Sequence, residues 1–64
     1  MTRQDYYKQR LALDKDFERY LLTGNLDAAK QTKKNIGDLM KQGLQELGEQ
    51  EFFNVELEFE TNNY

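Results

Sequence analysis

The feature that most restricts the fold is an alternation of apolar and polar residues near the C-terminus, in residues 52–60. Such a period of two is typical of a β-strand with one buried face. In a helix, residues two positions apart point to nearly opposite sides of the axis, so the same apolar side chains would be scattered. We therefore predict a strand over about 52–60. Its inward side chains would be Phe53, Val55, Leu57 and Phe59, and its outward side chains Asn54, Glu56, Glu58 and Glu60.

The predicted strand has no partner strand in its own chain, because no other segment shows this alternation. A lone strand leaves backbone N–H and C=O groups without hydrogen-bond partners. The strand should therefore pair with a second copy of itself, with another protein or, less readily, with an irregular segment of its own chain. If two copies paired their strands, the glutamates of one strand would face those of the other, which is unfavourable. Pairing with a different protein therefore remains an alternative.

The first part of the chain shows helical periodicity instead, which predicts a helix over about 2–22. Thr2 is suited to the N-cap position, and Asp5 stands where the acid of a capping box belongs. Arg10 lies within the main apolar stripe and is expected to bend its charged end outward. A second, narrower apolar edge should contact another subunit or the C-terminal strand, and it consists of Tyr7, Leu11 and Leu22.

A second helix is predicted over about 26–47, after a turn at residues 23–25. Gly24 can adopt the left-handed conformation that ends a helix, and Asn25 can cap the next one. A turn this short makes the two helices antiparallel neighbours. Gly43 lies on the apolar face of the second helix, where the lack of a side chain would let a neighbouring helix approach closely.

The length of 64 residues predicts a single domain over 1–64 that is marginally stable as a monomer. The chain has no cysteine and no histidine, so disulfides and the commonest metal ligands are excluded, and association with another subunit remains as a stabilising device. The predicted fold is mostly α with a small β element. It is an α+β homodimer of helical hairpins, each followed by one C-terminal strand and a frayed tail over 61–64.

The net charge of −3 is divided unevenly along the chain. All nine lysines and arginines lie in residues 1–45 together with six acids, whereas residues 46–64 hold six glutamates and no basic residue. The two parts therefore carry charges of about +3 and −6, a division that predicts a binding partner for one of them. The alternative is an acidic face that serves only solubility and discourages pairing at the strand edge.

The favoured function is that of a non-enzymatic protein-interaction module, a regulator or inhibitor that binds another protein through its acidic strand face. The chain lacks histidine, cysteine and serine, which excludes the usual nucleophilic triads and thiol chemistry. Its four glycines are isolated, so it has no glycine-rich phosphate loop. We expect no catalytic residue, metal, cofactor or small-molecule substrate.

Two alternatives remain. The second predicted helix carries a stripe of lysines that could follow the phosphates of a nucleic acid, and a helical-hairpin dimer would present two such stripes. The stripe consists of Lys30, Lys33, Lys34 and Lys41. The chain could also be a structural or assembly subunit without independent activity. No apolar run is long enough to span a membrane and no signal-like leader opens the chain, so we expect a cytoplasmic protein with no membrane partner.

Overall fold

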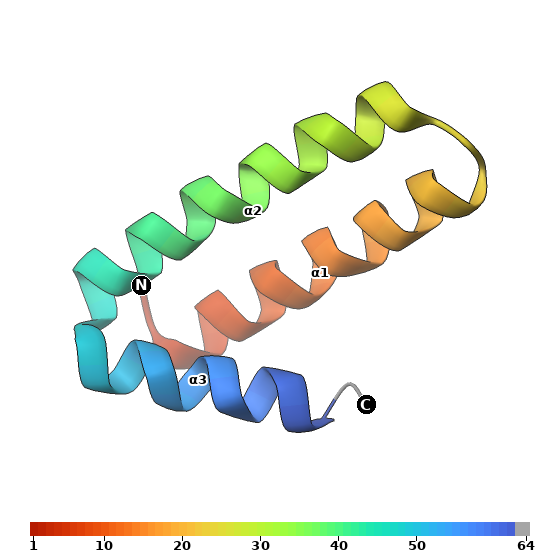
Figure 1. The fold of residues 1–64 in the computed structure, drawn as a ribbon. Coiled ribbons are helices and arrows are strands. Elements are labelled where there is room, and N and C mark those ends of the chain that lie inside the picture. Colours follow the sequence, from red (N-terminus) through yellow and green to blue (C-terminus); the bar gives the residue numbers. More distant parts are fainter. Residues whose placement is uncertain (63–64) are drawn as a thin grey trace.

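The computed structural model describes residues 1–62, and these form three α-helices (Figure 1). Helices α1 (Arg3–Leu22) and α2 (Leu26–Leu47) make an antiparallel hairpin. Helix α3 (Glu49–Asn62) then folds back against the beginning of α1 and the end of α2. The two helices of the predicted hairpin are present, with boundaries within a residue of those expected.

The prediction of a C-terminal strand is wrong, and with it the α+β fold class and the strand ribbon between two copies. Residues 49–62 form α3, and the described part of the chain contains no strand, so the fold is all-α. The physical reason is that the same segment also contains apolar residues at helical spacing. Phe52, Val55 and Phe59 stand three and four positions apart, which places them on one side of a helix. The hairpin offers that side an apolar surface to pack against, and all three side chains are buried.

The predicted start of the first helix is confirmed in atomic detail. The backbone N–H of Asp5 donates to the hydroxyl of Thr2 at 3.1 Å, and the Asp5 carboxylate accepts from the backbone N–H of Thr2 at 3.3 Å. These two hydrogen bonds form a capping box that satisfies amides at the helix end. Because they favour the charged carboxylate, they lower the pKa of Asp5 below its ordinary value.

The turn between the first two helices also follows the prediction. Gly24 has a φ of 75°, a conformation that a side chain would disfavour. The side chain of Asn25 accepts a hydrogen bond from the backbone N–H of Ala28 at 3.2 Å, and so caps α2. Gly48, with a φ of 87°, makes the next sharp turn, from α2 into α3. Glu49 and Glu51 follow in the first turn of α3, where the helix dipole favours negative charge.

The core lies where the three helices meet, and its central residue is Tyr6, which is 0% exposed. The ring of Tyr6 packs edge-on against Phe52, with 5.5 Å between ring centroids. It also lies directly on Gly43, where an added Cβ would come within 2.7 Å of two ring carbons. The prediction that Gly43 permits a close approach is therefore confirmed, and the approaching group is an aromatic side chain of α1.

Helix α3 covers one half of the hairpin. Its 14 residues extend about 21 Å, whereas the 20 and 22 residues of α1 and α2 extend about 30 and 33 Å. Figure 1 shows α3 ending alongside the middle of α1. In the half of the hairpin next to the Gly24 turn, α1 and α2 therefore pack against each other without cover from α3. We call this part the turn half.

Candidate functional site

The predicted acidic face does not exist as a single surface, because residues two positions apart lie on different sides of α3. Glu56 turns toward α1 and is mostly buried. Glu58 forms an ion pair with Arg3 at 2.5 Å. Glu60 and Asn54 are exposed. Their role in binding a partner stays a prediction, but the geometry from which it was inferred is wrong.

The residues predicted to pack or to dimerise are divided in the same way. Val55 and Phe59 are buried, whereas Phe53 and Leu57 are 56% and 62% exposed. The predicted inward row of four is therefore wrong for its two exposed members. Tyr7 is half-buried and packs edge-on against Phe59, with centroids 5.7 Å apart, so it meets residues 52–60, although these form helix α3 and not the strand expected there. The other two residues of that edge differ from each other, since Leu11 is half-buried and Leu22 is 81% exposed.

Glu56 belongs to a polar cluster between α1 and α3 that sequence reasoning missed. It accepts a hydrogen bond from the hydroxyl of Tyr6 and lies 3.5 Å from Nε of Arg10. Arg10 also pairs with Asp14 at 2.6 Å and stacks over the ring of Phe59, at 5.1 Å from its centroid. Arg10 is thus turned into the α1–α3 interface, and the expectation that its charged end bends outward is wrong. The signal in the sequence was the presence of a charge within an apolar stripe.

The cluster holds Tyr6 in its neutral form. Burial is the main cause that raises the pKa of Tyr6 above its ordinary value of 10, and the hydrogen bond to Glu56 adds to it. Nε of Arg10 is buried and has no hydrogen-bond acceptor among the described residues, because Glu56 is too far away for one. The remaining groups pair with one another across the interface, so the cluster fastens α3 to α1, and Asp14 is its most exposed member.

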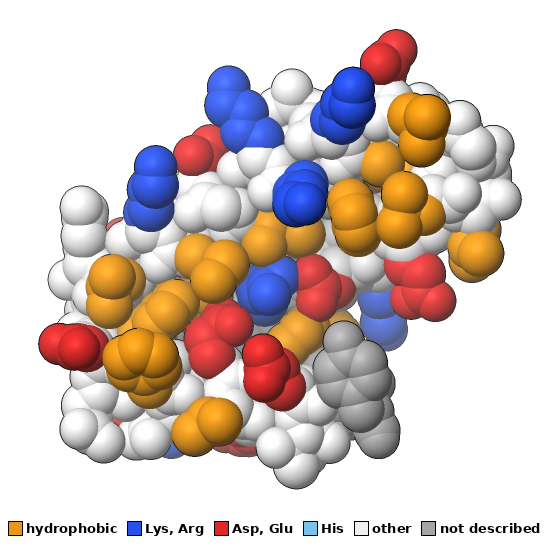
Figure 2. All heavy atoms as spheres, in the orientation of Figure 1, with side chains coloured by type: hydrophobic (Ala, Val, Ile, Leu, Met, Phe, Trp, Pro, Cys, Tyr) orange, Lys and Arg blue, Asp and Glu red, His pale blue; other side chains and the backbone are white. Residues whose placement is uncertain are grey.

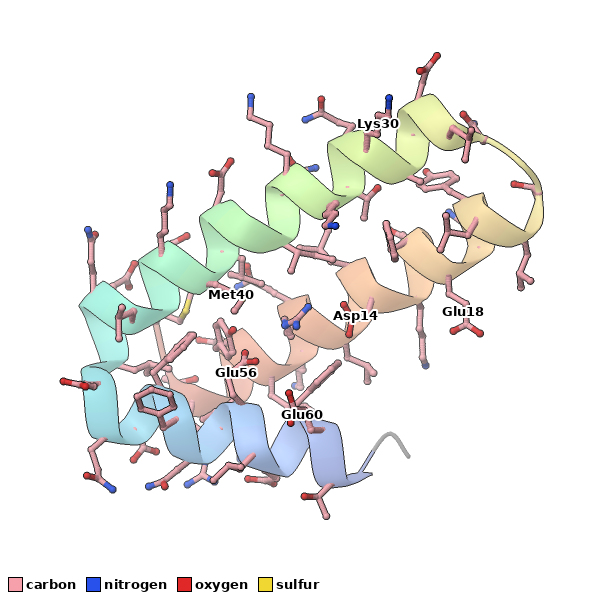
Figure 3. All side chains as sticks on the ribbon, viewed as in Figure 1. Asp14, Glu18, Lys30, Met40, Glu56 and Glu60 are labelled. Atoms are coloured by element: carbon pink, nitrogen blue, oxygen red, sulfur yellow. The ribbon has the colours of Figure 1, made fainter. Side chains whose placement is uncertain are left out.

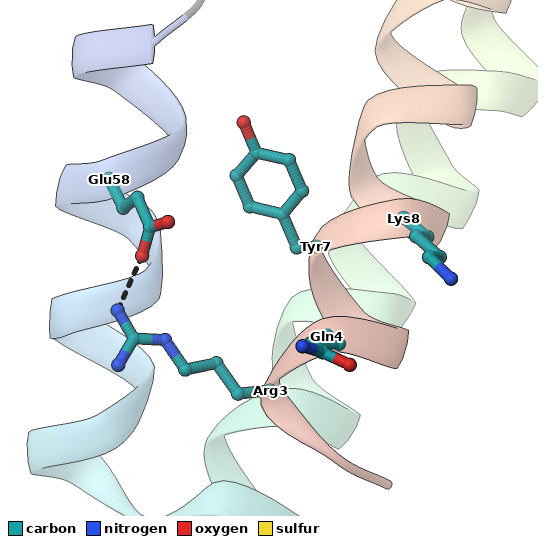
Figure 4. A pocket seen from close by; sticks show the side chains of 5 residues that line it. All are labelled: Arg3, Gln4, Tyr7, Lys8 and Glu58. Atoms are coloured by element: carbon teal, nitrogen blue, oxygen red, sulfur yellow. Dashed lines mark hydrogen bonds and ion pairs between the residues drawn. The ribbon is translucent and has the colours of Figure 1, made fainter.

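An open groove of about 600 Å³ lies on the other side of the α1–α3 contact (Figure 4). Its lining is Arg3, Gln4, Tyr7, Lys8 and Glu58. Figure 4 shows the Arg3 guanidinium directed at Glu58, while Lys8 points away from that pair. Arg3 also contacts Glu51 at 3.3 Å. Two glutamates neutralise Arg3, so Lys8, which points away from that pair, is the lining cation that forms no ion pair with the described residues.

A smaller hollow of about 310 Å³ lies between α2 and α3, and it is more apolar. We call it the α2–α3 hollow. Its lining is Met40, Phe52, Phe53, Glu56, Leu57 and Glu60. Phe53 and Leu57 are one helical turn apart, and both are exposed beside it. Glu56 and Glu60 are also one turn apart, and both point from α3 toward the hairpin in Figure 3. Unlike Glu56, Glu60 forms no ion pair with any described residue, so its charge is available to a partner.

The predicted lysine stripe is present as an exposed face of α2. Lys30, Lys33, Lys34 and Lys41 are all exposed, and none forms an ion pair within residues 1–62. Figure 3 shows Lys30 pointing away from α1, and Figure 2 shows basic side chains along the same outer edge. Asp27 and Asp38 stand three or four positions from these lysines and reduce the local positive potential. The role in nucleic-acid binding stays a prediction.

Comparison of the chain with protein-family models, curated proteins and solved structures found no match. The class that the fold defines is a small all-α protein of three helices. Over residues 1–62, no helix combines the length and the apolar character needed to cross a membrane. The same part of the chain has no cluster of acidic side chains arranged to hold a metal ion. A proposal on function therefore depends on the surface of this chain alone.

Proposed function

We propose that this protein is a non-enzymatic interaction module, a regulator or inhibitor that binds an amphipathic helix of another protein at the α2–α3 hollow. The observation that carries the proposal is the exposure of Phe53 and Leu57 beside the hollow, while Val55 and Phe59 of the same helix are buried. Large apolar side chains grouped on one exposed surface are typical of protein-binding sites. Leu44, which is 44% exposed, extends the apolar character along α2.

The size and the charge of the hollow favour a partner of defined chemistry. Its size fits one or two apolar side chains, and a helix can supply such anchors at intervals of three or four residues. Glu60 on its rim favours a partner with lysine or arginine beside those anchors. The charge of about −6 in residues 46–64 would attract a basic partner over a longer distance.

The test is a titration of the isotope-labelled protein with a synthetic helical peptide, followed by two-dimensional NMR. The peptide carries leucines at helical spacing, flanked by lysines on both sides. We expect the largest shifts at Met40, Phe53 and Leu57. The double variant Phe53→Gln, Leu57→Gln should bind at least tenfold more weakly, whereas Leu22→Gln, an equally conservative change at a distant exposed leucine, should bind normally. Shifts confined to other surfaces, or equal binding by all three proteins, would contradict the proposal.

The charge preference is tested separately. Glu60→Lys should weaken binding of the lysine-flanked peptide and strengthen binding of a matched peptide in which glutamates replace the lysines. Because Glu60 is exposed, the variant should fold as the parent does, which circular dichroism checks. If both proteins bind both peptides alike, the acidic rim has no part in recognition.

A second candidate function is nucleic-acid binding by α2, and the observation that favours it is the absence of ion pairs at four exposed lysines within the described residues. Replacement of Lys30, Lys34 and Lys41 by glutamate should abolish any binding to a mixed-sequence RNA duplex. A true phosphate contact would also weaken steeply with rising salt. Binding that is unaffected by these changes would remove this candidate.

A further inference from the structure

We propose that the α2–α3 hollow binds an arginine side chain of the partner helix, whose guanidinium lies against the ring of Phe53 and pairs with the carboxylates of Glu56 and Glu60. This inference rests on the proposed function, and it identifies the side chain that the hollow recognises. The apolar anchors of the same helix pack beside this arginine, on the exposed Leu57.

The lining of the hollow combines apolar walls with two acids. Its apolar part consists of Met40, Phe52, Phe53 and Leu57, its acidic part consists of Glu56 and Glu60, and it contains no basic residue. An arginine side chain fits both parts, because its aliphatic stem packs on apolar surface while its charged end pairs with carboxylates. The volume of about 310 Å³ is large enough for one such side chain. Apolar anchors alone would remove water from the two carboxylates without replacing it.

Arg10 shows how this chain already holds an arginine in such surroundings. Its guanidinium stacks over the ring of Phe59, at 5.1 Å from the centroid, and its Nε lies 3.5 Å from the carboxylate of Glu56. A second carboxylate, that of Asp14, accepts a hydrogen bond from Arg10 at 2.6 Å. The hollow offers the same kinds of group, an exposed aromatic ring and two carboxylates, and Arg10 is not part of its lining. An arginine from a partner would complete this arrangement.

The acids of this region outnumber its bases. Asp14 and Glu56 share the cation Arg10. Glu60 forms no ion pair within residues 1–62, so these three acids and one base leave a net charge of about −2. Oε1 of Glu56 makes both of its internal contacts, whereas Oε2 makes none with the described residues. Nε of Arg10 is the one buried side-chain atom without a partner in this part of the chain, so Oε2 of Glu56 remains open to a ligand.

Arginine suits these two carboxylates better than lysine does. Glu56 and Glu60 are one helical turn apart, with about 6 Å between their Cβ atoms, and both point from α3 toward the hairpin (Figure 3). A guanidinium carries its N–H donors around one plane, so it can donate to both carboxylates and lie flat on the ring of Phe53, which is 56% exposed. A lysine ammonium is a compact, strongly hydrated charge without a planar face. The hollow should therefore prefer arginine.

The first test compares three helical peptides by isothermal titration calorimetry. They share the same leucine anchors and differ at one position, one helical turn from an anchor, which holds arginine, lysine or citrulline. Citrulline resembles arginine in shape but carries no charge. We expect the arginine peptide to bind at least tenfold more tightly than the citrulline peptide and about threefold more tightly than the lysine peptide.

The outcomes separate this inference from the proposed function. Equal binding of the three peptides would overturn the arginine site. The proposed function would then still stand if Phe53→Gln, Leu57→Gln weakened all three, because the leucine anchors alone would account for binding. Failure of all three peptides to bind would contradict both proposals.

Two single variants locate the arginine in the hollow. Glu60→Gln should reduce the preference for arginine over citrulline to about threefold or less, whereas Glu18→Gln, at an exposed glutamate of α1, should leave it unchanged. Phe53→Leu keeps an apolar side chain but removes the ring, so it should abolish the preference for arginine over lysine. Circular dichroism checks that each variant remains helical. A preference that survives both Glu60→Gln and Phe53→Leu would overturn the proposal.

Discussion

Tyr6 is the residue through which the three helices are joined. It belongs to α1, its ring lies on Gly43 of α2, and its hydroxyl donates to Glu56 of α3. The ring supplies apolar contact at the centre of the core, and the hydroxyl reaches the one edge where a carboxylate can accept its hydrogen bond. Changes at this residue, or at the groups it touches, should therefore affect the whole fold.

Gly43→Ala should lower the free energy of unfolding by up to about 2 kcal/mol, which is the difference between two opposing effects. Alanine is the better helix former by about 1 kcal/mol, but its Cβ would come within 2.7 Å of the Tyr6 ring, and overpacking of this kind costs about 1–3 kcal/mol. Urea denaturation measures the difference. Gly37→Ala is the control, because a Cβ there meets nothing within 4 Å, and it should stabilise the protein by up to about 1 kcal/mol. Equal stabilisation by both changes would show that Tyr6 does not lie on Gly43.

The stability of the protein should fall at alkaline pH because of Tyr6. The folded state raises the pKa of Tyr6 above its unfolded value of about 10, so the contribution of the neutral hydroxyl is fully present below pH 10 and is lost as the pH rises further. Tyr6→Phe should cost about 2 kcal/mol at neutral pH, because it leaves the Glu56 carboxylate without its donor. Urea denaturation between pH 7 and pH 11 should show the gap between the two proteins narrowing above pH 10. A constant gap would exclude this titration.

At the scale of the element, α3 is a helix whose sequence also satisfies the pattern of a strand. Its alternating residues would all face inward in a strand, but the helix buries only the members that share a side with Phe52. A third helix makes its backbone hydrogen bonds internally, so it can pack on the hairpin through side chains alone. A strand would need a second strand to accept and donate its backbone hydrogen bonds. Phe53 and Leu57 belong to the same alternating pattern, but in the helix they face away from the core and remain exposed.

Phe59→Ala and Leu57→Ala should differ sharply in their effect on stability. Phe59 is buried and its removal should cost about 3 kcal/mol or more, whereas Leu57 is largely exposed and its removal should cost about 0.5 kcal/mol or less. Thermal unfolding followed by circular dichroism compares the two. In a strand with both residues inward, the costs would be similar, so equal destabilisation would contradict the helical assignment of residues 49–62.

At the scale of the whole molecule, the uneven cover of the hairpin matters most. The half next to α3 holds the core and the polar cluster, and the turn half holds the exposed Leu21, Leu22 and Leu26. The homodimer expected from the small size of the chain would couple folding to association, because a second copy adds apolar burial that the single chain lacks.

The midpoint of thermal unfolding should consequently depend on protein concentration. For a dimer of this size, a tenfold increase in concentration should raise the midpoint by about 5 °C, because dissociation accompanies unfolding. Differential scanning calorimetry at several concentrations measures this shift. A wild-type midpoint that does not move would mean that the chain unfolds as a monomer.

Local chemistry accounts for the parts of the fold that could be predicted. Thr2, Gly24 and Asn25 act within a few residues of themselves, so their roles as caps and turn residues could be inferred from type and position. The contacts of Arg10 and Glu56 join residues 46 positions apart, and no local pattern indicates that they meet. The candidate site was missed for the same reason, since the hollow exists only because Phe53 and Leu57 remain outside a core formed by other residues.

The sequence by itself determined the hairpin, because short-range hydrogen bonds and helical periodicity specify α1, α2 and the turn between them. Only the tertiary structure decided the state of residues 49–62. Their apolar positions are compatible with both a period of two and spacings of three and four, and the two conformations differ in what they require nearby. A strand requires a partner for its backbone, which the described chain does not provide. A helix satisfies its own backbone and requires only an apolar surface, which Tyr6, Leu39 and Gly43 supply.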